Sequence, residues 1–262
     1  MNHLNIVALI AVTLSIGYSE NKIEPADNQQ NHEMTPTMND AIGADILDQT
    51  FELNSGDEIR YSILIPDNYD PETPKPLIVA LHYGGEVTPH FARGLIEKLI
   101  APGLHELNAI ILAPDSIAGP WTNEKNESMV LELMDFICEK HNIDQEQTLL
   151  TGFSMGGHGT WYIGSRNQDR FSAMIPIAGY PLVEEDVKWA TPVYAIHSTA
   201  DTVVPIEATD EFVTAQREQG NEQIRLVTVD DLPHYQTGGF AVPLKNTVPW
   251  VKKIWGIEPI DN

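Results

Sequence analysis

Cysteine is almost absent from this chain of 262 residues, in which Cys138 is the only one. A lone thiol cannot form a disulfide within the chain, and with histidines scattered along the sequence it does not indicate a zinc cluster. Cys138 ends the segment 129–138, where apolar residues recur at helical spacing. We therefore expect a packed, unreactive thiol rather than a cysteine nucleophile.

Basic residues are also scarce: 15 Lys and Arg stand against 38 Asp and Glu, which gives a formal net charge of -23 at pH 7. A surface this acidic repels phosphate backbones and anionic lipids, so we expect no nucleic-acid partner and no binding to an anionic membrane surface. Two interpretations of the charge stay open. It keeps the protein soluble, for example in a salty medium that screens the repulsion, or it recognises a cationic ligand.

Long apolar runs are missing too. Residues 4–16 form a short apolar run with the length of a signal-peptide core, and small residues follow at Gly17 and Ser19. We expect a signal peptide at 1–19 and a secreted or periplasmic protein, with an uncleaved membrane anchor or an internal strand as the alternatives. Because no cysteine lies near the expected cleavage point, we expect no lipoprotein anchor. The apolar run is too short to span a bilayer comfortably, so we expect no stable membrane anchor either.

The rest of the chain divides into a spacer and one domain. Residues 20–43 are rich in Asn, Gln, Glu, Pro and Thr and lack apolar periodicity, which predicts a disordered linker. Residues 44–262 suit a single α/β domain in length. Hydrophobic residues make up 42% of the chain and aromatic residues 8%, which is enough to fill a core of that size.

Strand and helix patterns alternate along most of this domain. Apolar runs predict strands at 48–53, 59–65, 76–81, 109–113, 147–151, 171–178, 192–197 and 224–229. Helical spacing predicts helices at 91–100, 128–141, 159–166, 203–219 and 248–255. Such alternation predicts a mainly parallel sheet with helices on both faces, in which ligands bind at the carboxyl ends of the strands.

The segment Gly152-Phe-Ser154-Met-Gly156 follows a predicted buried strand and precedes a predicted helix. In that setting the Gly-x-Ser-x-Gly pattern indicates a nucleophilic serine on a sharp, strained turn. The two glycines remove side chains that would collide with the strand and the helix. The N–H of Met155 then lies at a helix start, where it can face a developing oxyanion. The alternative is a glycine-rich turn with a serine helix cap.

The sequence resembles the α/β-hydrolase superfamily. It is similar in particular to bacterial esterases of the polyhydroxybutyrate-depolymerase-like, feruloyl-esterase-like and phospholipase/carboxylesterase-like groups. The resemblance lies in the segments 81–85, 150–161 and 197–205 and in His234, in the order that the family has them. It implies an α/β-hydrolase fold, with a mostly parallel sheet and helices on both faces. None of these segments is specific to one substrate.

The family order of serine, acid and histidine implies a catalytic triad. Asp201 follows the predicted strand 192–197 and is the expected acid, although it could also cap the next helix. Asp230 and Asp231 are the rival acids. His234 is the only histidine after Asp201, so it is the expected base.

Two other histidines near the motifs are expected to have structural roles. His197 ends a predicted strand and is expected to be packed there. His158 lies in the first turn of the helix that follows Ser154, and we expect it to be structural or to form part of a wall.

The resemblance also implies an oxyanion hole. Its first donor is the N–H of Met155, and its second should come from His82-Tyr-Gly-Gly85, which resembles the family's His-Gly-x-Gly segment. Tyr83 stands where the family usually has glycine. We favour the Gly84 N–H, with Tyr83 as the second choice and a plain glycine turn as the alternative. His82 itself is expected to be a structural hydrogen-bonding residue.

The substrate pocket is less specified. Only residues 179–190 separate two predicted strands where many lipases insert a lid, so we expect an open site with little or no lid. Trp121 and Tyr83 are the candidate substrate-binding residues, and for Trp121 a buried packing role is an equal alternative. Tyr180 and Tyr235 are weaker candidates.

These observations predict a secreted serine esterase that acts through an acyl-enzyme, with Ser154 as nucleophile and His234 as acid–base. An open site favours soluble, polymer-linked or carbohydrate-linked esters. We expect neither a metal nor an organic cofactor. The alternatives are a peptidase of the prolyl-oligopeptidase type and a hydrolase fold that has lost catalysis and serves in binding.

Overall fold

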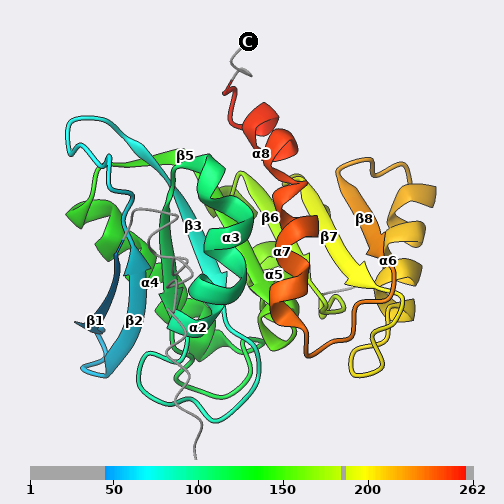
Figure 1. Ribbon diagram of the computed structural model, residues 1–262, viewed down its shortest axis with the longest axis horizontal. Helices are drawn as coiled ribbons and strands as arrows, with labels where there is room; N and C mark the ends of the chain where they lie inside the picture. Colours follow the sequence, from blue (N-terminus) through cyan, green and yellow to red (C-terminus); the bar gives the residue numbers. More distant parts are fainter. Residues whose placement is uncertain (1–44, 184–186, 258–262) are drawn as a thin grey trace, which may run out of the picture. The chain divides into compact units, whose positions relative to one another are not determined.

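A single eight-stranded sheet forms the centre of the part that the computed structural model describes, residues 45–183 and 187–257 (Figure 1). The strand order is β1-β2-β4-β3-β5-β6-β7-β8. The bounds are β1 Ile46–Glu52, β2 Glu58–Leu64, β3 Lys75–Leu81, β4 Ile110–Pro114, β5 Ile143–Phe153, β6 Ala173–Ile177, β7 Val193–Ser198 and β8 Ile224–Val229. The expected leader (1–19) and linker (20–43) lie outside the described residues.

The sheet is parallel from β4 to β8 and antiparallel at one edge, where β2 pairs with both β1 and β4. The expected mainly parallel sheet is therefore confirmed. In the central pairs, Leu81 of β3 is level with Gly152 of β5, and Phe153 of β5 is level with Ile177 of β6. The carboxyl ends of these strands thus meet at one edge, where the functional loops begin.

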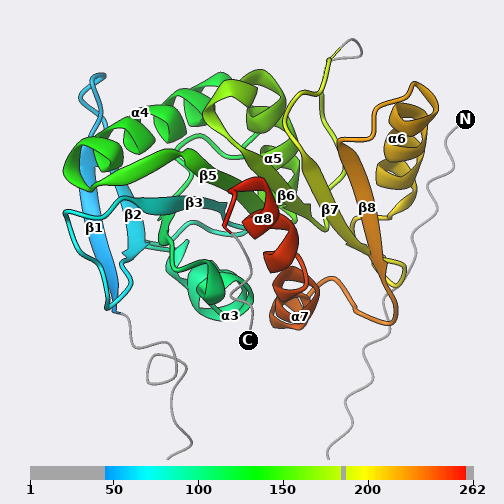
Figure 2. The same ribbon diagram turned by 90° about the horizontal axis from the view of Figure 1, so that it is seen from above.

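Helices cover both faces of the sheet (Figure 2). One face carries the helices α4 Glu124–Lys140, α5 Met155–Arg166 and α6 Glu207–Glu218. The other carries α2 Arg93–Leu95, α3 Ala101–Leu104, α7 Ala241–Lys245 and α8 Val248–Ile254. Short 3₁₀ segments lie at His105–Leu107, Gln168–Arg170 and Thr237–Phe240.

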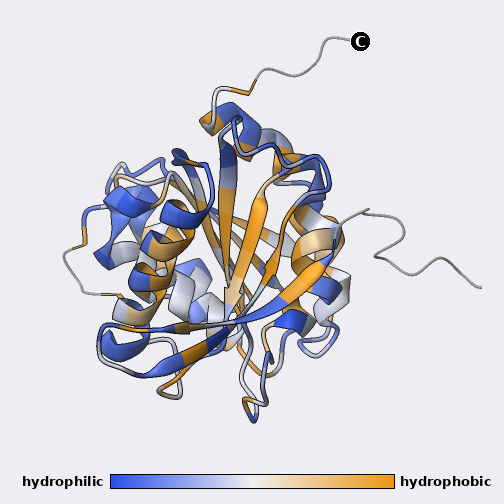
Figure 3. Ribbon diagram, turned by 90° about the vertical axis from the view of Figure 1, so that its left-hand side faces the viewer, coloured by the Kyte–Doolittle hydropathy of each residue, from blue (hydrophilic) through white to orange (hydrophobic). Residues whose placement is uncertain are grey.

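Strand β3 shows why the sheet is buried on both sides. Ile78 and Ala80 pack into the core under α3, α7 and α8, whereas Leu77 and Val79 pack into the core under α4 and α5. Successive side chains of a strand point to opposite faces, so a continuous apolar run fills both cores. Figure 3 shows these hydrophobic strands between helices that carry hydrophilic segments.

Several helix bounds differ from the expectation for local reasons. Helix α4 begins at Glu124 rather than 128, because Asn123 caps it by accepting a 2.9 Å hydrogen bond from the Asn126 N–H. The expected helix 91–100 is instead the short α2, a π-helical turn at Ile96–Ile100 and α3. Pro102 follows that turn and has no N–H to continue regular helical bonding.

Helix α6 begins at Glu207 rather than 203, because the residues before it form the loop around Asp201. The short α7 was not expected. In the described part of the chain, no helix combines the length and the hydropathy that crossing a membrane requires.

Candidate active site

Ser154 lies between the end of β5 and the start of α5 with φ 56° and ψ -116°. Positive φ is uncommon for a residue other than glycine and marks local backbone strain. A Cβ added at Gly152 would overlap the carbonyl of Gly156, so strand and helix approach too closely here for a side chain. The sharp turn expected from the Gly-x-Ser-x-Gly segment is confirmed.

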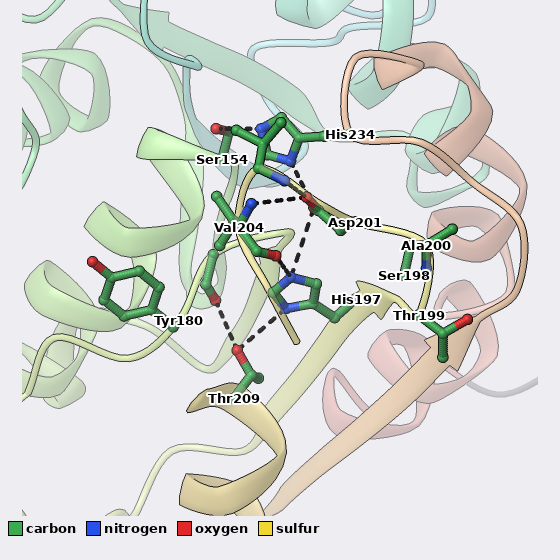
Figure 4. Close-up of polar contacts among 12 residues, drawn as sticks. Ser154, Tyr180, His197, Ser198, Thr199, Ala200, Asp201, Val204, Thr209 and His234 are labelled. Atoms are coloured by element: carbon green, nitrogen blue, oxygen red, sulfur yellow. Dashed lines mark hydrogen bonds and ion pairs between the residues drawn. The ribbon is translucent and has the colours of Figure 1, made fainter. Parts of the chain in front are cut away.

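Ser154, His234 and Asp201 lie in one hydrogen-bonded line (Figure 4). Ser154 Oγ is 2.8 Å from His234 Nε2, and His234 Nδ1 is 2.6 Å from Asp201 Oδ2. A carboxylate only accepts hydrogen bonds, so Nδ1 carries the proton and Nε2 is free to accept the serine hydroxyl. This is the arrangement that a general base needs.

The two partners of Ser154 are well shielded from water. Asp201 is 6% exposed and His234 is 5% exposed. The second carboxylate oxygen, Asp201 Oδ1, accepts from the N–H groups of Val203 at 3.0 Å and Val204 at 2.8 Å. Asp201 therefore holds the start of its own loop and the imidazole at once.

The rival acids do not occupy this position. The carboxylate bonded to His234 is that of Asp201, whereas Asp230 accepts from the Thr199 hydroxyl at 3.2 Å. Asp231 has φ 56° in the turn that leads to His234. The structure thus brings the three expected triad residues together from the ends of β5, β7 and β8.

The loop after β3 is organised by His82. Its Nε2 accepts from the Ser116 N–H at 3.0 Å, so its Nδ1 carries the proton and donates to the Tyr83 carbonyl at 2.7 Å. Burial is the main cause that lowers the pKa of His82 and keeps the ring neutral. The expectation of a structural hydrogen-bonding residue is confirmed.

That hydrogen bond also orients the peptide between Tyr83 and Gly84. In a trans peptide the N–H points away from the C=O, so the Gly84 N–H faces away from the His82 ring. A Cβ at Gly84 would lie 3.8 Å from the Cβ of Met155. The two expected oxyanion donors, Gly84 and Met155, thus belong to neighbouring segments beside Ser154.

Trp121 requires a correction. Its side chain is 0% exposed, and its indole N–H donates to the His82 carbonyl at 2.9 Å. A fully buried ring offers no surface to a substrate, so the packing alternative describes Trp121. The sequence could not separate the two roles, because the loop after β4 folds back over α5: a Cβ at Gly159 would touch the Trp121 side chain.

The tyrosine candidates differ in exposure. The Tyr83 ring is half-buried between Phe91 and Phe153, with ring centroids at 5.3 Å and 6.4 Å. Tyr180 is also half-buried. Tyr235 is 83% exposed and stands beside the His234 ring, at 5.5 Å between centroids. Of these three residues, Tyr235 presents the most surface at the triad.

His158 packs beside the triad. It bonds to the Tyr180 carbonyl through Nδ1 at 3.0 Å, with the two rings at 4.2 Å, as expected for a structural residue. Cys138 lies on α4, where burial raises the pKa of its thiol and keeps it protonated at neutral pH. Within the described residues, no group of three or more His, Cys, Asp or Glu could hold a metal ion.

A nucleophile turn after β5, an acid loop after β7 and a histidine loop after β8, on a mainly parallel sheet, define an α/β-hydrolase fold. Sequence comparison gives the family: the model of the Esterase family, described as "Putative esterase", matches residues 54–229, and the chain belongs to this family. The matched range includes Ser154 and Asp201 and ends before His234.

Individual proteins agree with this assignment. Feruloyl esterase C of Emericella nidulans is 28% identical over 156 residues, which cover 56% of this chain and 57% of that protein. The bifunctional acetylxylan esterase/xylanase XynS20E of Neocallimastix patriciarum is 25% identical over 180 residues, covering 66% of this chain and 26% of that protein. These matches confirm the resemblance to feruloyl-esterase-like proteins.

A crystal structure of a thermostable esterase superposes with TM-score 0.68 at 24% identity, covering 80% of this chain and 63% of that one. At this identity the likeness shows the fold alone. The chain spans 64% and 57% of the length of two fungal feruloyl esterases that it matches.

Proposed function

We propose that this chain is a serine esterase in which Ser154, His234 and Asp201 hydrolyse carboxylic esters. The observation that supports it most directly is the line of hydrogen bonds from Ser154 Oγ to His234 Nε2, at 2.8 Å, and from His234 Nδ1 to Asp201 Oδ2, at 2.6 Å. Family membership supports the same reaction, because the whole matched range lies in the domain that carries Ser154 and Asp201.

The reaction has two steps. His234 Nε2 takes the hydroxyl proton as Ser154 Oγ attacks the ester carbon, and the same nitrogen returns that proton to the leaving alcohol, which leaves an acyl group on Ser154. His234 then takes a proton from water as the water oxygen attacks the acyl carbon. It returns that proton to Ser154 Oγ as the bond between Oγ and the acyl carbon breaks, which releases the acid and regenerates the free serine. In both steps the N–H groups of Met155 and Gly84 stabilise the oxyanion.

The substrates that we propose are esters carried by polymers, such as acetylated or feruloylated polysaccharides. Two relatives are named for feruloyl and acetylxylan esters. The exposed Tyr235 ring beside His234 supplies an apolar surface of the kind that stacks on sugars or phenolic rings. Between β6 and β7, residues 178–183 and 187–192 contain no helix or strand that could form a lid.

A substrate panel tests this proposal. Purified protein is assayed on p-nitrophenyl acetate, methyl ferulate, acetylated xylan and polyhydroxybutyrate. A peptide p-nitroanilide tests for amide cleavage, and the Ser154→Ala variant is the negative control. Hydrolysis of the esters, absent in Ser154→Ala, is expected. Faster cleavage of the anilide would instead favour a peptidase, and equal rates in the variant would end the assignment.

We also propose that the protein is exported and that the signal peptide is removed after residue 19. The apolar run at 4–16, followed by small residues, supports this. The intact mass of protein recovered from outside the cytoplasm tests it: loss of residues 1–19 is expected, and an uncleaved amino terminus would contradict it.

A further inference from the structure

A second buried histidine, His197, lies behind the catalytic acid. It is 0% exposed, and its Nε2 is 3.8 Å from Asp201 Oδ2, the oxygen that holds His234. The proposed mechanism gives this imidazole no proton to carry. Its position at the end of β7, four residues before Asp201, places it under the loop that presents the acid.

The hydrogen bonds of the ring define its protonation. Nε2 is 2.8 Å from the Val204 carbonyl, which can only accept, so Nε2 carries the proton and donates it there. Nδ1 is 3.2 Å from the Thr209 hydroxyl and accepts from it. Both nitrogens are thus engaged without Asp201, and the 3.8 Å separation from the carboxylate is too long for a hydrogen bond.

The ring is also kept neutral. Burial is the main cause that lowers the pKa of His197; the bond to Val204 and the charge of Asp201 act in the opposite direction, and the nearby His234 and His158 lower it further. Neutrality matters because a charged His197 would compete with His234 for the same carboxylate oxygen. Asp201 can therefore direct its charge to His234.

Val204 links the second histidine to the acid. Its N–H donates to Asp201 Oδ1 at 2.8 Å, and its carbonyl accepts from His197 Nε2 at 2.8 Å. Both polar groups of one residue are thereby held, one by the acid and one by His197. A change that frees the Val204 carbonyl therefore removes one of the two hydrogen bonds that hold this residue beside the Asp201 carboxylate.

Thr209 ties this arrangement to the rest of the domain. It lies on α6, is 1% exposed and contacts the Gly179 carbonyl at 3.5 Å as well as the His197 ring. Gly179 in turn packs against the backbone of Gly157 in α5, the helix that begins after Ser154. Thr209, which holds the His197 ring (Figure 4), and the helix after Ser154 thus both contact the segment at Gly179.

We propose that His197 is a positioning residue for the catalytic acid: through the Val204 carbonyl it holds the loop that points Asp201 at His234, and Thr209 fixes its ring. This inference rests on the proposed ester hydrolysis. It predicts that the loss of the Nε2–H donor reduces the rate of the chemical step although His197 touches neither substrate nor reacting atoms.

The test compares His197→Leu with His197→Gln. Leu fills a similar volume without a donor, whereas the Gln amide keeps an N–H near the position of Nε2. We expect kcat on p-nitrophenyl acetate to fall about 10- to 100-fold in His197→Leu with KM little changed, and His197→Gln to recover a large part of it. The acid limb of kcat/KM in His197→Leu should move to lower pH, because a displaced carboxylate stabilises the His234 imidazolium less.

A second pair of variants tests the position of the ring without changing His197 itself. Thr209→Val loses the hydroxyl that fixes the ring, whereas Thr209→Ser keeps it. We therefore expect kcat to fall in Thr209→Val and to stay close to wild type in Thr209→Ser. His141→Leu is the control: it makes the same substitution in the segment between α4 and β5, remote from Ser154 at the carboxyl end of β5, and should leave kcat unchanged.

The outcomes separate the two proposals. If wild-type protein hydrolyses no ester, the proposed function fails. If wild-type protein is active and His197→Leu, folded by circular dichroism, keeps wild-type kcat and an unshifted pH profile, the positioning role is overturned. A loss of kcat in His197→Leu without recovery in His197→Gln, with Thr209→Val equal to wild type, would also overturn it.

Discussion

The carbonyl oxygen of Leu81 lies where a Cβ of Gly156 would have to be. Leu81 ends β3 and Gly156 lies in the first turn of α5, so the helix that follows Ser154 rests directly on the neighbouring strand. This contact brings the loop after β3, with Gly84, beside Met155. The glycine therefore sets the distance between the two segments that carry the proposed oxyanion donors.

Substitution of that glycine should be severely destabilising. In Gly156→Ala the methyl group meets backbone rather than a movable side chain, so we expect a loss of more than about 2 kcal/mol in the free energy of unfolding. Urea unfolding measures it. Gly94→Ala is the matched control, since its Cβ would meet only the Tyr83 hydroxyl at 3.4 Å. Equal stabilities for the two variants would contradict the argument.

The second oxyanion donor can be tested at Gly84 with two substitutions. Gly84→Ala keeps the N–H, and its Cβ makes only ordinary contact with Met155, at 3.8 Å and 3.9 Å. Gly84→Pro removes the N–H. We expect kcat on p-nitrophenyl acetate to drop about 100- to 1000-fold in the proline variant and much less in the alanine variant. A folded Gly84→Pro protein with unchanged kcat would shift the donor to Tyr83.

The sequence predicted the nucleophile turn because its signal is local. Gly152, Ser154 and Gly156 stand between a strand pattern and a helix pattern, and the strain at Ser154 follows from that setting. The family order was enough to choose Asp201 and His234, which the structure brings together. The strand at 224–229 was also bounded correctly.

What the sequence could not predict depends on contacts between distant segments. The short α7 contains Pro243 and is held by packing, with Leu244 against Gly103. The buried state of Trp121 depends on its fit against His82. The contacts of His197 were hidden because Val204 and Thr209 reach its ring only after the acid loop has folded back.

Replacement of the Asp201 carboxylate by an amide should inactivate the enzyme, because it forces the His234 ring into the wrong tautomer. The Val203 and Val204 N–H groups hold one side-chain oxygen in place, so in Asp201→Asn the amide nitrogen must face His234 and donate to Nδ1. The ring proton then moves to Nε2, which can no longer accept from Ser154. We expect a loss of about 10,000-fold in kcat. Asp230→Asn, which changes a carboxylate bonded to Thr199, should stay close to wild type.

Stability should fall on mild acidification. Burial is the first cause that lowers the pKa values of His82, His141, His158 and His197 in the folded protein. As the pH drops through about 6.5, the unfolded chain takes up protons that the folded protein refuses, so the free energy of unfolding decreases. Urea unfolding between pH 8 and about pH 5.5, above the carboxylate range, measures this. A free energy that stayed level or rose would contradict the prediction.

The most direct test of the central proposal is to trap the acyl-enzyme. Wild-type protein is mixed with p-nitrophenyl acetate, quenched with acid within the first turnover and digested for peptide mass spectrometry, with Ser154→Ala treated in parallel. We expect an acetyl group on Ser154 in the wild type and none in the variant, which should also release no nitrophenol above background. Acetylation at another residue, or full turnover by Ser154→Ala, would contradict it.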